Sequence, residues 1–191
     1  GAPHARALPR AGVLARRHDH RLPRRGGGHL FSTAWSRETG IFRVSAAGGP
    51  AKRIRTGGQA PQFGASSDRV YLVDVAGEDE DVRSLVSIDL NGAEERTHLK
   101  GVYFTEARLS PDEKWIAFRE KYKVWVAPFT RTGRPFDIGP GMKDLPVRLL
   151  SREAGDHLGW SGDSRSISWS LGSDLFTRDL ADLFTFAPGA P

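Results

Sequence analysis

The stretch "LSPDEKWIAF" (Leu109–Phe118) decides the fold of this chain, because two other segments match it without a gap. They are "FGASSDRVYL" from Phe63, 46 residues earlier, and "WSGDSRSISW" from Trp160, 51 residues later. Each copy begins with an apolar residue, continues with a short polar stretch and ends in a run rich in β-branched and aromatic residues. A unit that returns about every fifty residues indicates a repeat protein, in which neighbouring copies bury a shared core.

Each copy is followed by a second segment in which apolar and polar residues alternate. These segments are "SLVSIDLNG" (Ser84–Gly92), "KVWVAPFTRTG" (Lys123–Gly133) and "SDLFTRDL" (Ser173–Leu180), and an earlier one, "GIFRVSAAGG" (Gly40–Gly49), begins 44 residues before the first. Alternation with a period of two is typical of β-strands. Residues that accept the positive φ of a tight turn follow at Gly48-Gly49, Asn91-Gly92 and Thr132-Gly133.

Short strands with frequent turn signals, and no sustained helical periodicity beyond the N-terminal region, predict an all-β protein. The repeat length predicts a partial β-propeller of about four blades, each a four-stranded antiparallel sheet. We expect an incomplete or damaged first blade that retains residues 31–58, then blades over 59–103, 104–152 and 153–191, the last also incomplete. Large side chains that fill the space between blades are expected at Trp115, Trp125, Trp160 and Trp169.

The polar stretch of each copy is interpreted as a turn between two strands. Ser110, Pro111 and Asp112 stand at the turn of the central copy, and Gly162 and Asp163 stand at the turn of the last copy. Proline presets φ, and aspartate hydrogen-bonds back to the backbone. We therefore assign these five residues a structural role in the turns, and we assign no catalytic, cofactor-binding or metal-binding residue in the chain.

The segment "ARLSPDEKWIAF … KVWVAPF" resembles the repeat of TolB-like, or WD40-like (PD40), β-propellers, whose hallmark is Ser-Pro-Asp-Gly before a strand. The resemblance covers residues 31–180, and Glu113 stands where the hallmark has glycine. The segments Leu149–Leu180 and Gly40–Leu72 are most similar to blades of bacterial proteins that carry a metal-dependent amidohydrolase domain after the propeller. In that family the amidohydrolase barrel holds the metal ligands and the catalysis, and none of its motifs is in this sequence.

The resemblance implies a non-catalytic accessory or gating domain of a larger hydrolase, located in the periplasm or outside the cell. Its partner would be the C-terminal hydrolase domain or another protein. The alternative is a free-standing propeller that binds a protein or a small ligand through its axial loops.

A third hypothesis, a propeller enzyme, requires carboxylates or histidines that converge on the axis. Asp89 and Asp179 occupy comparable strand positions, while His98 and His157 are isolated in the sequence. We interpret the two aspartates as solubilising residues close to turns. The sequence has neither a phosphate-binding glycine loop nor a nucleophile elbow, and we predict no cofactor.

The net charge of +5 is concentrated in residues 1–30, an arginine-rich segment. Its seven arginines outweigh its single acidic residue, Asp19, so that residues 31–191 carry a net charge of −1. Nucleic-acid binding needs clustered positive charge on the folded domain, and we therefore predict none. No apolar run reaches the length of a membrane span, no signal peptide is recognisable, and the lack of cysteine excludes disulfides and thiolate metal sites.

The N-terminal segment contains "LARRHDHRLPR" (Leu14–Arg24), at the place where the repeat requires another Ser-Pro-Asp-Gly strand. One allowed back-translation of this stretch, read from its second base, encodes Ser-Pro-Asp-Gly-Thr-Thr-Ile-Val-Tyr-Arg. We hypothesise that residues 5–25 are an out-of-frame translation of a genuine blade, and we expect residues 1–30 to be poorly ordered. Arginines that repel a cation flank His18-Asp19-His20, so we predict no metal site there.

Gly77–Arg83 ("GEDEDVR") is an acidic cluster between two predicted strands. Calcium sites use clustered carboxylates, but this spacing lacks the glycine-turned loop with a distal bidentate glutamate. We interpret the cluster as a solvated hairpin tip. Four blades from a larger ring leave two open sheet edges, and because an exposed edge invites pairing with another strand, we expect self-association through these edges.

Overall fold

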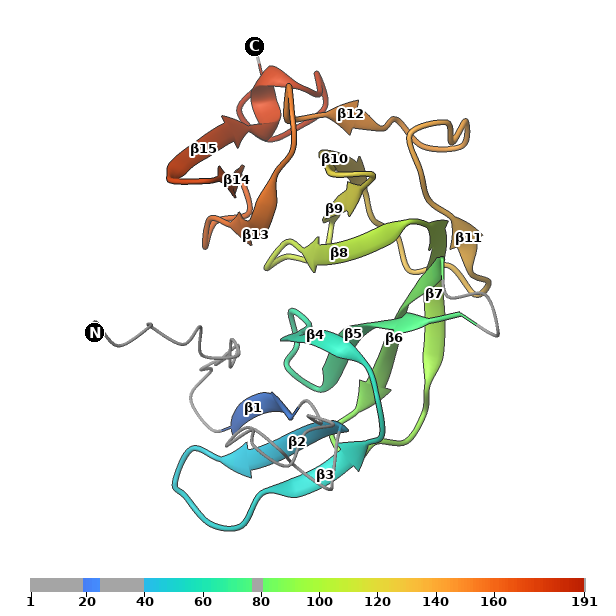
Figure 1. The fold of residues 1–191 in the computed structure, drawn as a ribbon, viewed down its shortest axis with the longest axis vertical. Helices are drawn as coiled ribbons and strands as arrows, with labels where there is room; N and C mark the ends of the chain where they lie inside the picture. Colours follow the sequence, from blue (N-terminus) through green and yellow to red (C-terminus); the bar gives the residue numbers. More distant parts are fainter. Residues whose placement is uncertain (1–18, 25–39, 77–80, 191) are drawn as a thin grey trace, which may run out of the picture.

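The computed structural model describes residues 19–24, 40–76 and 81–190, and these residues form β-strands joined by turns. The strands gather into four sheets that follow one another in chain order (Figure 1). The only helical element in this described part is a 3-10 helix, η1 (Leu180–Asp182). The predicted all-β class is therefore confirmed.

We number the sheets as blades 1 to 4. Blade 1 consists of β1 (Asp19–Arg24), β2 (Gly40–Ser45) and β3 (Lys52–Arg55). Blade 2 consists of β4 (Gln59–Phe63), β5 (Arg69–Val75), β6 (Val82–Asp89) and β7 (Arg96–Val102). Blade 3 consists of β8 (Phe104–Leu109), β9 (Trp115–Glu120), β10 (Lys123–Pro128) and β12 (Arg148–Leu149). Blade 4 consists of β13 (Asp156–Trp160), β14 (Ser166–Leu171) and β15 (Asp174–Asp179).

The second and third strands of the repeat pair with the same register in every blade. These strands are β1 and β2 in blade 1, β5 and β6 in blade 2, β9 and β10 in blade 3, and β14 and β15 in blade 4. Their Cα partners include His20 and Val44 in blade 1, Val70 and Ile88 in blade 2, Ile116 and Ala127 in blade 3, and Ile167 and Arg178 in blade 4. These positions are equivalent in the sequence repeat. Because successive side chains of a strand point to opposite faces, a shared register sends equivalent residues to the same side of each blade.

The sheets depart in part from the predicted four antiparallel strands. Blades 1 and 4 contain three described strands each, and the sheet of blade 2 gains β11 (Phe136–Asp137) as a fifth strand. β11 pairs parallel with β7, although it belongs to the loop that follows β10 of blade 3. The next residue, Ile138, donates its N–H to the Lys100 carbonyl at 2.7 Å and is buried between blades 2 and 3. Burial of this side chain explains why the loop returns to the edge of blade 2.

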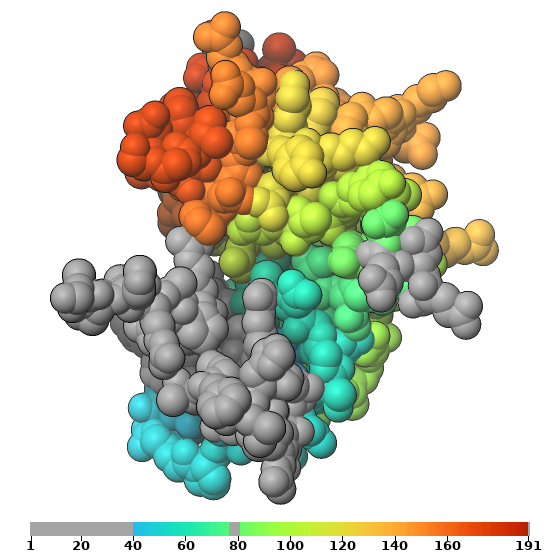
Figure 2. Space-filling view, in the orientation of Figure 1, coloured from blue at the N-terminus to red at the C-terminus, as the bar shows by residue number. Residues whose placement is uncertain are grey.

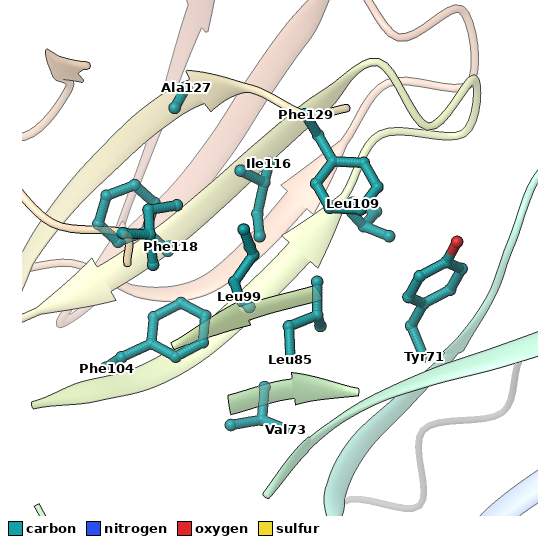
Figure 3. Packing of buried hydrophobic residues seen from close by; sticks show 12 residues of the cluster. Tyr71, Val73, Leu85, Leu99, Phe104, Leu109, Ile116, Phe118, Ala127 and Phe129 are labelled. Atoms are coloured by element: carbon teal, nitrogen blue, oxygen red, sulfur yellow. The ribbon is translucent and has the colours of Figure 1, made fainter. Parts of the chain in front are cut away.

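The hydrophobic core consists of three clusters, one at each boundary between neighbouring blades. Blades 1 and 2 meet through Ile41, Ile54, Val70, Leu72, Val86 and Ile88. Blades 2 and 3 meet through Tyr71, Val73, Leu85, Leu99, Phe104, Ala107, Leu109, Ile116, Phe118 and Ala127 (Figure 3). Blades 3 and 4 meet through Trp115, Ala117, Val124, Val126, Leu158, Ile167 and Trp169. Because burial lies between sheets, each blade is stabilised by its neighbours.

The turn between the first and second strands has one geometry in blades 2, 3 and 4. Its fourth residue donates an N–H to the carbonyl of its first residue at 2.9–3.0 Å, in the pairs Ser67 to Gly64, Glu113 to Ser110 and Ser164 to Ser161. This fourth residue has positive φ, +60° at Ser67, +56° at Glu113 and +63° at Ser164. Glycine occupies this position in the Ser-Pro-Asp-Gly hallmark, because a residue without a Cβ adopts positive φ readily.

The residues assigned to the turn of blade 3 lie in this motif. Ser110 Oγ donates to Asp112 Oδ1 at 2.6 Å, and Asp112 Oδ1 accepts the N–H of Lys114 at 3.1 Å. Ser110 Oγ also accepts the N–H of Trp115 at 3.0 Å, where β9 begins. Pro111 stands between the two side chains that hold the turn. The two polar side chains thus satisfy backbone donors that the turn leaves without a strand partner.

Blade 4 repeats the arrangement, with Ser161 and Asp163 in the places of Ser110 and Asp112. Asp163 Oδ1 accepts the Ser161 hydroxyl at 2.6 Å and the N–H of Arg165 at 3.1 Å. The Ser161 hydrogen bond, followed by that from the Arg165 backbone, lowers the pKa of Asp163. Gly162 replaces the proline, and a Cβ added there would meet no atom within 4 Å.

The tight-turn glycines follow the prediction with one exception. Gly48, Gly49 and Gly92 have φ of +91°, +112° and +87°. The prediction is wrong at Gly133, which lies in the long loop between β10 and β11 and does not have positive φ. The tryptophans at 115, 125, 160 and 169 all lie in strands, as expected.

β1 falls within the arginine-rich segment 1–30 and pairs antiparallel with β2. The rest of that segment, including His18, lies outside the described residues, as do residues 77–80 of the acidic cluster. The out-of-frame origin of residues 5–25 stays a prediction. Across the described part of the chain, no helix has the length and apolar character that a membrane span needs.

Candidate binding site at the loop end of the blades

Antiparallel topology brings two kinds of connection to one end of every blade. The turn between the second and third strands leaves from the same end as the connection to the next blade. In blade 3 these are the β9–β10 turn, with Lys121 and Tyr122, and the β7–β8 connection, with Tyr103. We call this end the loop end and the opposite end, with the Ser110 turn, the turn end. The blades lie side by side in the space-filling view, with blade 3 in green to yellow between blades 2 and 4 (Figure 2).

A hollow of about 340 Å³ opens at the loop end of blade 3. It is lined by Tyr103, Thr105, Arg119, Lys121 and Tyr122. Tyr122 is 77% exposed and Tyr103 is 43% exposed. The Lys121 ammonium lies 5.1 Å from the centroid of the Tyr103 ring, which is within the range of a cation–π interaction.

The backbone that presents these side chains is held in an uncommon conformation. Tyr103, Lys121 and Tyr122 have φ of +57°, +46° and +76°, which costs on the order of 1–3 kcal/mol for each side chain of this size. Neighbouring blades hold the strained residues in place. The Tyr103 N–H donates to the Asp81 carbonyl of blade 2 at 2.8 Å, and the Tyr122 carbonyl accepts the Gly155 N–H at 2.8 Å. Two exposed aromatic rings are therefore displayed from a fixed backbone.

The two cations of the hollow have different environments. Arg119 forms an ion pair with Asp156 of blade 4, and its Nε donates to Thr105 Oγ1 at 2.8 Å. Lys121 has no ion-pair partner in the part of the chain that the structure describes. Burial raises the pKa of the neighbouring Glu120, and the positive charge of Lys121 opposes that shift. The hollow thus presents one ammonium that a ligand or a partner protein can neutralise.

The innermost strands are joined by polar side chains that cross from blade to blade. Gln62 of β4 accepts the Leu109 N–H at 3.1 Å and donates to the Ala107 carbonyl at 3.4 Å. Glu106 of β8 accepts the N–H of Leu158 in β13 at 3.2 Å. These side chains are used to hold strands in register, which fixes the position of the loop end.

A buried polar network lies at the turn end, between blades 2 and 3. The Tyr71 hydroxyl donates to Glu113 Oε2 at 3.1 Å, and Glu113 also forms an ion pair with Arg131. Burial, followed by the Glu113 charge, raises the pKa of Tyr71 to about 12. His98 packs beside the Tyr71 ring with its Nε2 2.7 Å from the hydroxyl of Ser87, and burial lowers its pKa to about 4.

The catalytic candidates considered in the sequence do not come together at an axial site. His98 lies on β7, the outer strand of the antiparallel part of blade 2, so it is not an axial residue. His157 lies on β13 with φ of +61°. Asp89 ends β6 and accepts the N–H groups of the following turn, whereas Asp179 ends β15. Among the described residues, no group of three or more His, Asp or Glu side chains is placed to hold a metal ion.

Sequence reasoning missed the hollow at the loop end. A signal was present in "REKYKVW", where two strands are joined by Lys121-Tyr122 with neither glycine nor asparagine at the turn. Bulky residues at a two-residue hairpin turn must adopt positive φ, and such strain is often kept where the side chains have a function.

Comparison with known proteins places the chain by its fold. No protein-family model matches the sequence, and no curated protein matches it. A gluconolactonase from Xanthomonas campestris aligns with a TM-score of 0.59 and 12% identity, over 86% of this chain and 54% of that protein. The periplasmic gluconolactonase of Pseudomonas aeruginosa aligns with a TM-score of 0.53 and 15% identity, over 87% and 51%. TolB from Acinetobacter baumannii aligns with a TM-score of 0.51 and 12% identity, over 73% and 34%.

The chain is a β-propeller protein that comprises part of a ring. Identities of 12–15% establish the shared fold alone. The chain spans from 34% to 54% of the length of the three propellers to which it is similar.

Proposed function

We propose that this chain is a non-catalytic propeller module that docks onto another protein domain through the loop end of its blades. In the parent protein the partner is a metal-dependent amidohydrolase domain, which the propeller covers or gates. The observation that carries the proposal is the exposed pair Tyr103 and Tyr122, displayed with Lys121 from a strained backbone that neighbouring blades hold.

These side chains have the properties of a protein-docking surface. Tyrosine supplies a large contact area with few rotatable bonds, and tyrosine and arginine are over-represented among residues that dominate binding energies. The Lys121 ammonium favours an acidic group on the partner, such as a carboxylate at the mouth of an active site. A surface held before binding also loses little conformational entropy when the partner docks.

The identity of the partner rests on the resemblance of Leu149–Leu180 and Gly40–Leu72 to propellers that precede an amidohydrolase barrel. A location in the periplasm or outside the cell is supported by the same resemblance. The Pseudomonas aeruginosa protein of the same fold is a periplasmic gluconolactonase, which is consistent with that location.

The hollow itself supports a second candidate function, the binding of a small ligand. Two tyrosine rings and the Lys121 ammonium line a hollow of about 340 Å³, and this lining suits a ligand with a carboxylate and a flat or hydroxylated body. Because two proteins of the same fold are gluconolactonases, D-gluconate is a suitable probe. Calorimetric titration should show binding that Tyr122→Ala removes, whereas no heat with the unaltered chain contradicts this candidate.

Photo-cross-linking in the full-length parent protein tests docking. A benzophenone amino acid in place of Tyr122 should cross-link to the hydrolase domain, as mass spectrometry of the joined peptides would show. The control is the same amino acid in place of Phe186, which is exposed and stacks on Trp115 at the turn end. Cross-links from position 186 but not from 122, or a reading frame that encodes no hydrolase domain, would overturn the proposal.

A further inference from the structure

Among the described residues, blade 4 has no strand on the outer side of β15, at the place where blades 2 and 3 each carry a fourth strand. Its third strand, β15, is the last strand of the sheet β13-β14-β15. The equivalent third strands, β6 and β10, each pair on their outer side with a fourth strand, β7 and β12. One more antiparallel strand can therefore pair with the outer side of β15.

The hydrogen bonds of β15 show which backbone groups face that open edge. The N–H of Leu180, just after the strand, donates to the Arg165 carbonyl before β14, at 2.9 Å. In an antiparallel pair the backbone groups of successive residues point alternately to the two sides. Asp174, Phe176 and Arg178 therefore point to β14, while Leu175, Thr177 and Asp179 offer their N–H and C=O groups to a new strand.

The side chains beside the edge form a charged and aromatic pattern. Asp174, Phe176 and Arg178 share one face of the strand, and they line a hollow of about 690 Å³ together with Trp169 and the loop 150–154. Phe176 stacks on Trp169 with a centroid distance of 5.7 Å and remains 41% exposed. On the other face Leu175 is 74% exposed. Neither Asp174 nor Arg178 has an ion-pair partner within the described residues.

We infer that β15 pairs antiparallel with β15 of a second copy of this chain, with Phe176 opposite Phe176 on the two-fold axis. This register places Asp174 of each copy opposite Arg178 of the other, so the sequence "DLFTRD" is complementary to itself. Leu175 and Thr177, whose backbone groups face the edge, become the hydrogen-bonded partners across the axis. The inference is independent of the proposed docking function, which uses the loop end.

Other registers fit this edge less well. A strand can shift only by two residues, because a shift by one would oppose groups that point to β14 with groups that point outward. A shift of two in one direction places Asp174 opposite Phe176, and in the other direction it places Arg178 opposite Phe176. Both lose the two ion pairs, and cross-strand pairs of opposite charge are a main source of register preference.

The 690 Å³ hollow gives the partner strand room. In the inferred register Phe176 of the second copy projects to the same face as Phe176 of the first, which lies between it and Trp169. The ring enters the hollow that these residues line. A ring buried in this way removes apolar surface from water in both copies, which adds a hydrophobic contribution to the backbone pairing.

Charge reversal tests the register by analytical ultracentrifugation. The unaltered chain should show a concentration-dependent monomer–dimer equilibrium. Asp174→Arg and Arg178→Asp should each raise the dissociation constant about tenfold, because each creates two like-charge pairs across the axis. The double variant restores opposite charges and should return the dissociation constant to within about threefold of the original value.

Lys143→Asp, in an exposed loop, is the control and should leave the dissociation constant unchanged. Circular dichroism establishes that each variant is folded. A chain that stays monomeric at every soluble concentration overturns the inference, and so does a dimer that neither single reversal weakens. Protection of the Leu175 and Thr177 amides from hydrogen exchange in a monomer also overturns it, since another part of the chain would then cover the edge.

Discussion

The hydroxyl of Tyr71 in blade 2 donates to Glu113 Oε2 in blade 3 at 3.1 Å, which joins the two sheets at the turn end. Glu113 has the backbone conformation of a glycine, with φ of +56°, yet its side chain is only 8% exposed. Its Oε1 accepts the N–H of Ala65 at 2.6 Å, and Oε2 pairs with Arg131. The departure from the Ser-Pro-Asp-Gly hallmark therefore has a structural reason, because the side chain links two blades.

Restoring glycine at this turn should destabilise the protein. Glu113→Gly relieves about 1 kcal/mol of backbone strain but leaves the Tyr71 hydroxyl and the Ala65 N–H without their acceptor. We expect a net loss of about 1–2 kcal/mol in the free energy of unfolding, measured by urea denaturation.

Ser67→Gly is the matched control, because Ser67 occupies the same turn position in blade 2 with φ of +60°. It relieves the strain with little lost contact and should raise the free energy of unfolding by up to about 1 kcal/mol. If both glycine variants are stabilising, Glu113 does not link the blades as described.

Gly92 is required by a close approach between blades 1 and 2. A Cβ at Gly92 would lie 1.8 Å from the Ile54 carbonyl oxygen, whereas one at Gly48 would meet nothing within 4 Å. Both glycines have positive φ. Gly48→Ala should cost about 1 kcal/mol and Gly92→Ala on the order of 3 kcal/mol or more, by chemical denaturation. Equal costs would show that blade 1 does not pack here.

Burial of His98 predicts a loss of stability in mild acid. Its pKa of about 4 in the folded chain lies below the ordinary value of 6.5, so the unfolded chain takes up the proton first as the pH falls. The stability that depends on neutral His98 is therefore fully present above pH 6.5 and is lost as the pH falls towards 4. In this window the free energy of unfolding decreases by up to about 1.4 kcal/mol per pH unit. His98→Gln should flatten the slope in this window, and an unchanged slope would assign the effect to other groups.

Relief of the backbone strain in the turn at the loop end should raise the stability of the chain and weaken its binding to the partner. Lys121→Asn with Tyr122→Gly supplies the residues that a two-residue turn with positive φ prefers. The melting temperature should rise, by the equivalent of about 1 kcal/mol, because the lost Tyr122 side chain is largely exposed. Photo-cross-linking to the partner domain, from a benzophenone amino acid in place of Tyr103, should weaken in the same variant. A variant that is more stable and docks equally well would show that the strain has no role in binding.

The out-of-frame hypothesis predicts that the other reading frame completes blade 1. Replacing residues 14–23 by Ser-Pro-Asp-Gly-Thr-Thr-Ile-Val-Tyr-Arg puts isoleucine at position 20, the register equivalent of Val70 and Ile116. It also removes Pro23 from a strand that pairs with β2. The melting temperature should rise in scanning calorimetry, and source DNA that cannot encode the motif in another frame would reject the hypothesis.

The repeat and two strands in each of its copies were predicted from the amino-acid sequence alone. Copies of one motif at regular spacing, with alternating side chains, leave few other arrangements, because a shift by one residue would turn every apolar side chain to the wrong face. Val70, Ile116 and Ile167 were aligned by sequence, and all three are buried between blades. The turn at Ser110 could be recognised because its hydrogen bonds span only a few residues.

Which residues meet across blades depends on the three-dimensional packing. The contact between Tyr71 and Glu113, the return of β11 to blade 2 and the hollow between Tyr103 and Tyr122 all join segments that are distant in the sequence or that leave the repeat. Local periodicity records how a strand faces its own sheet. The distance between side chains of neighbouring sheets depends on how those sheets pack, and packing is set by the shapes of all the buried residues together.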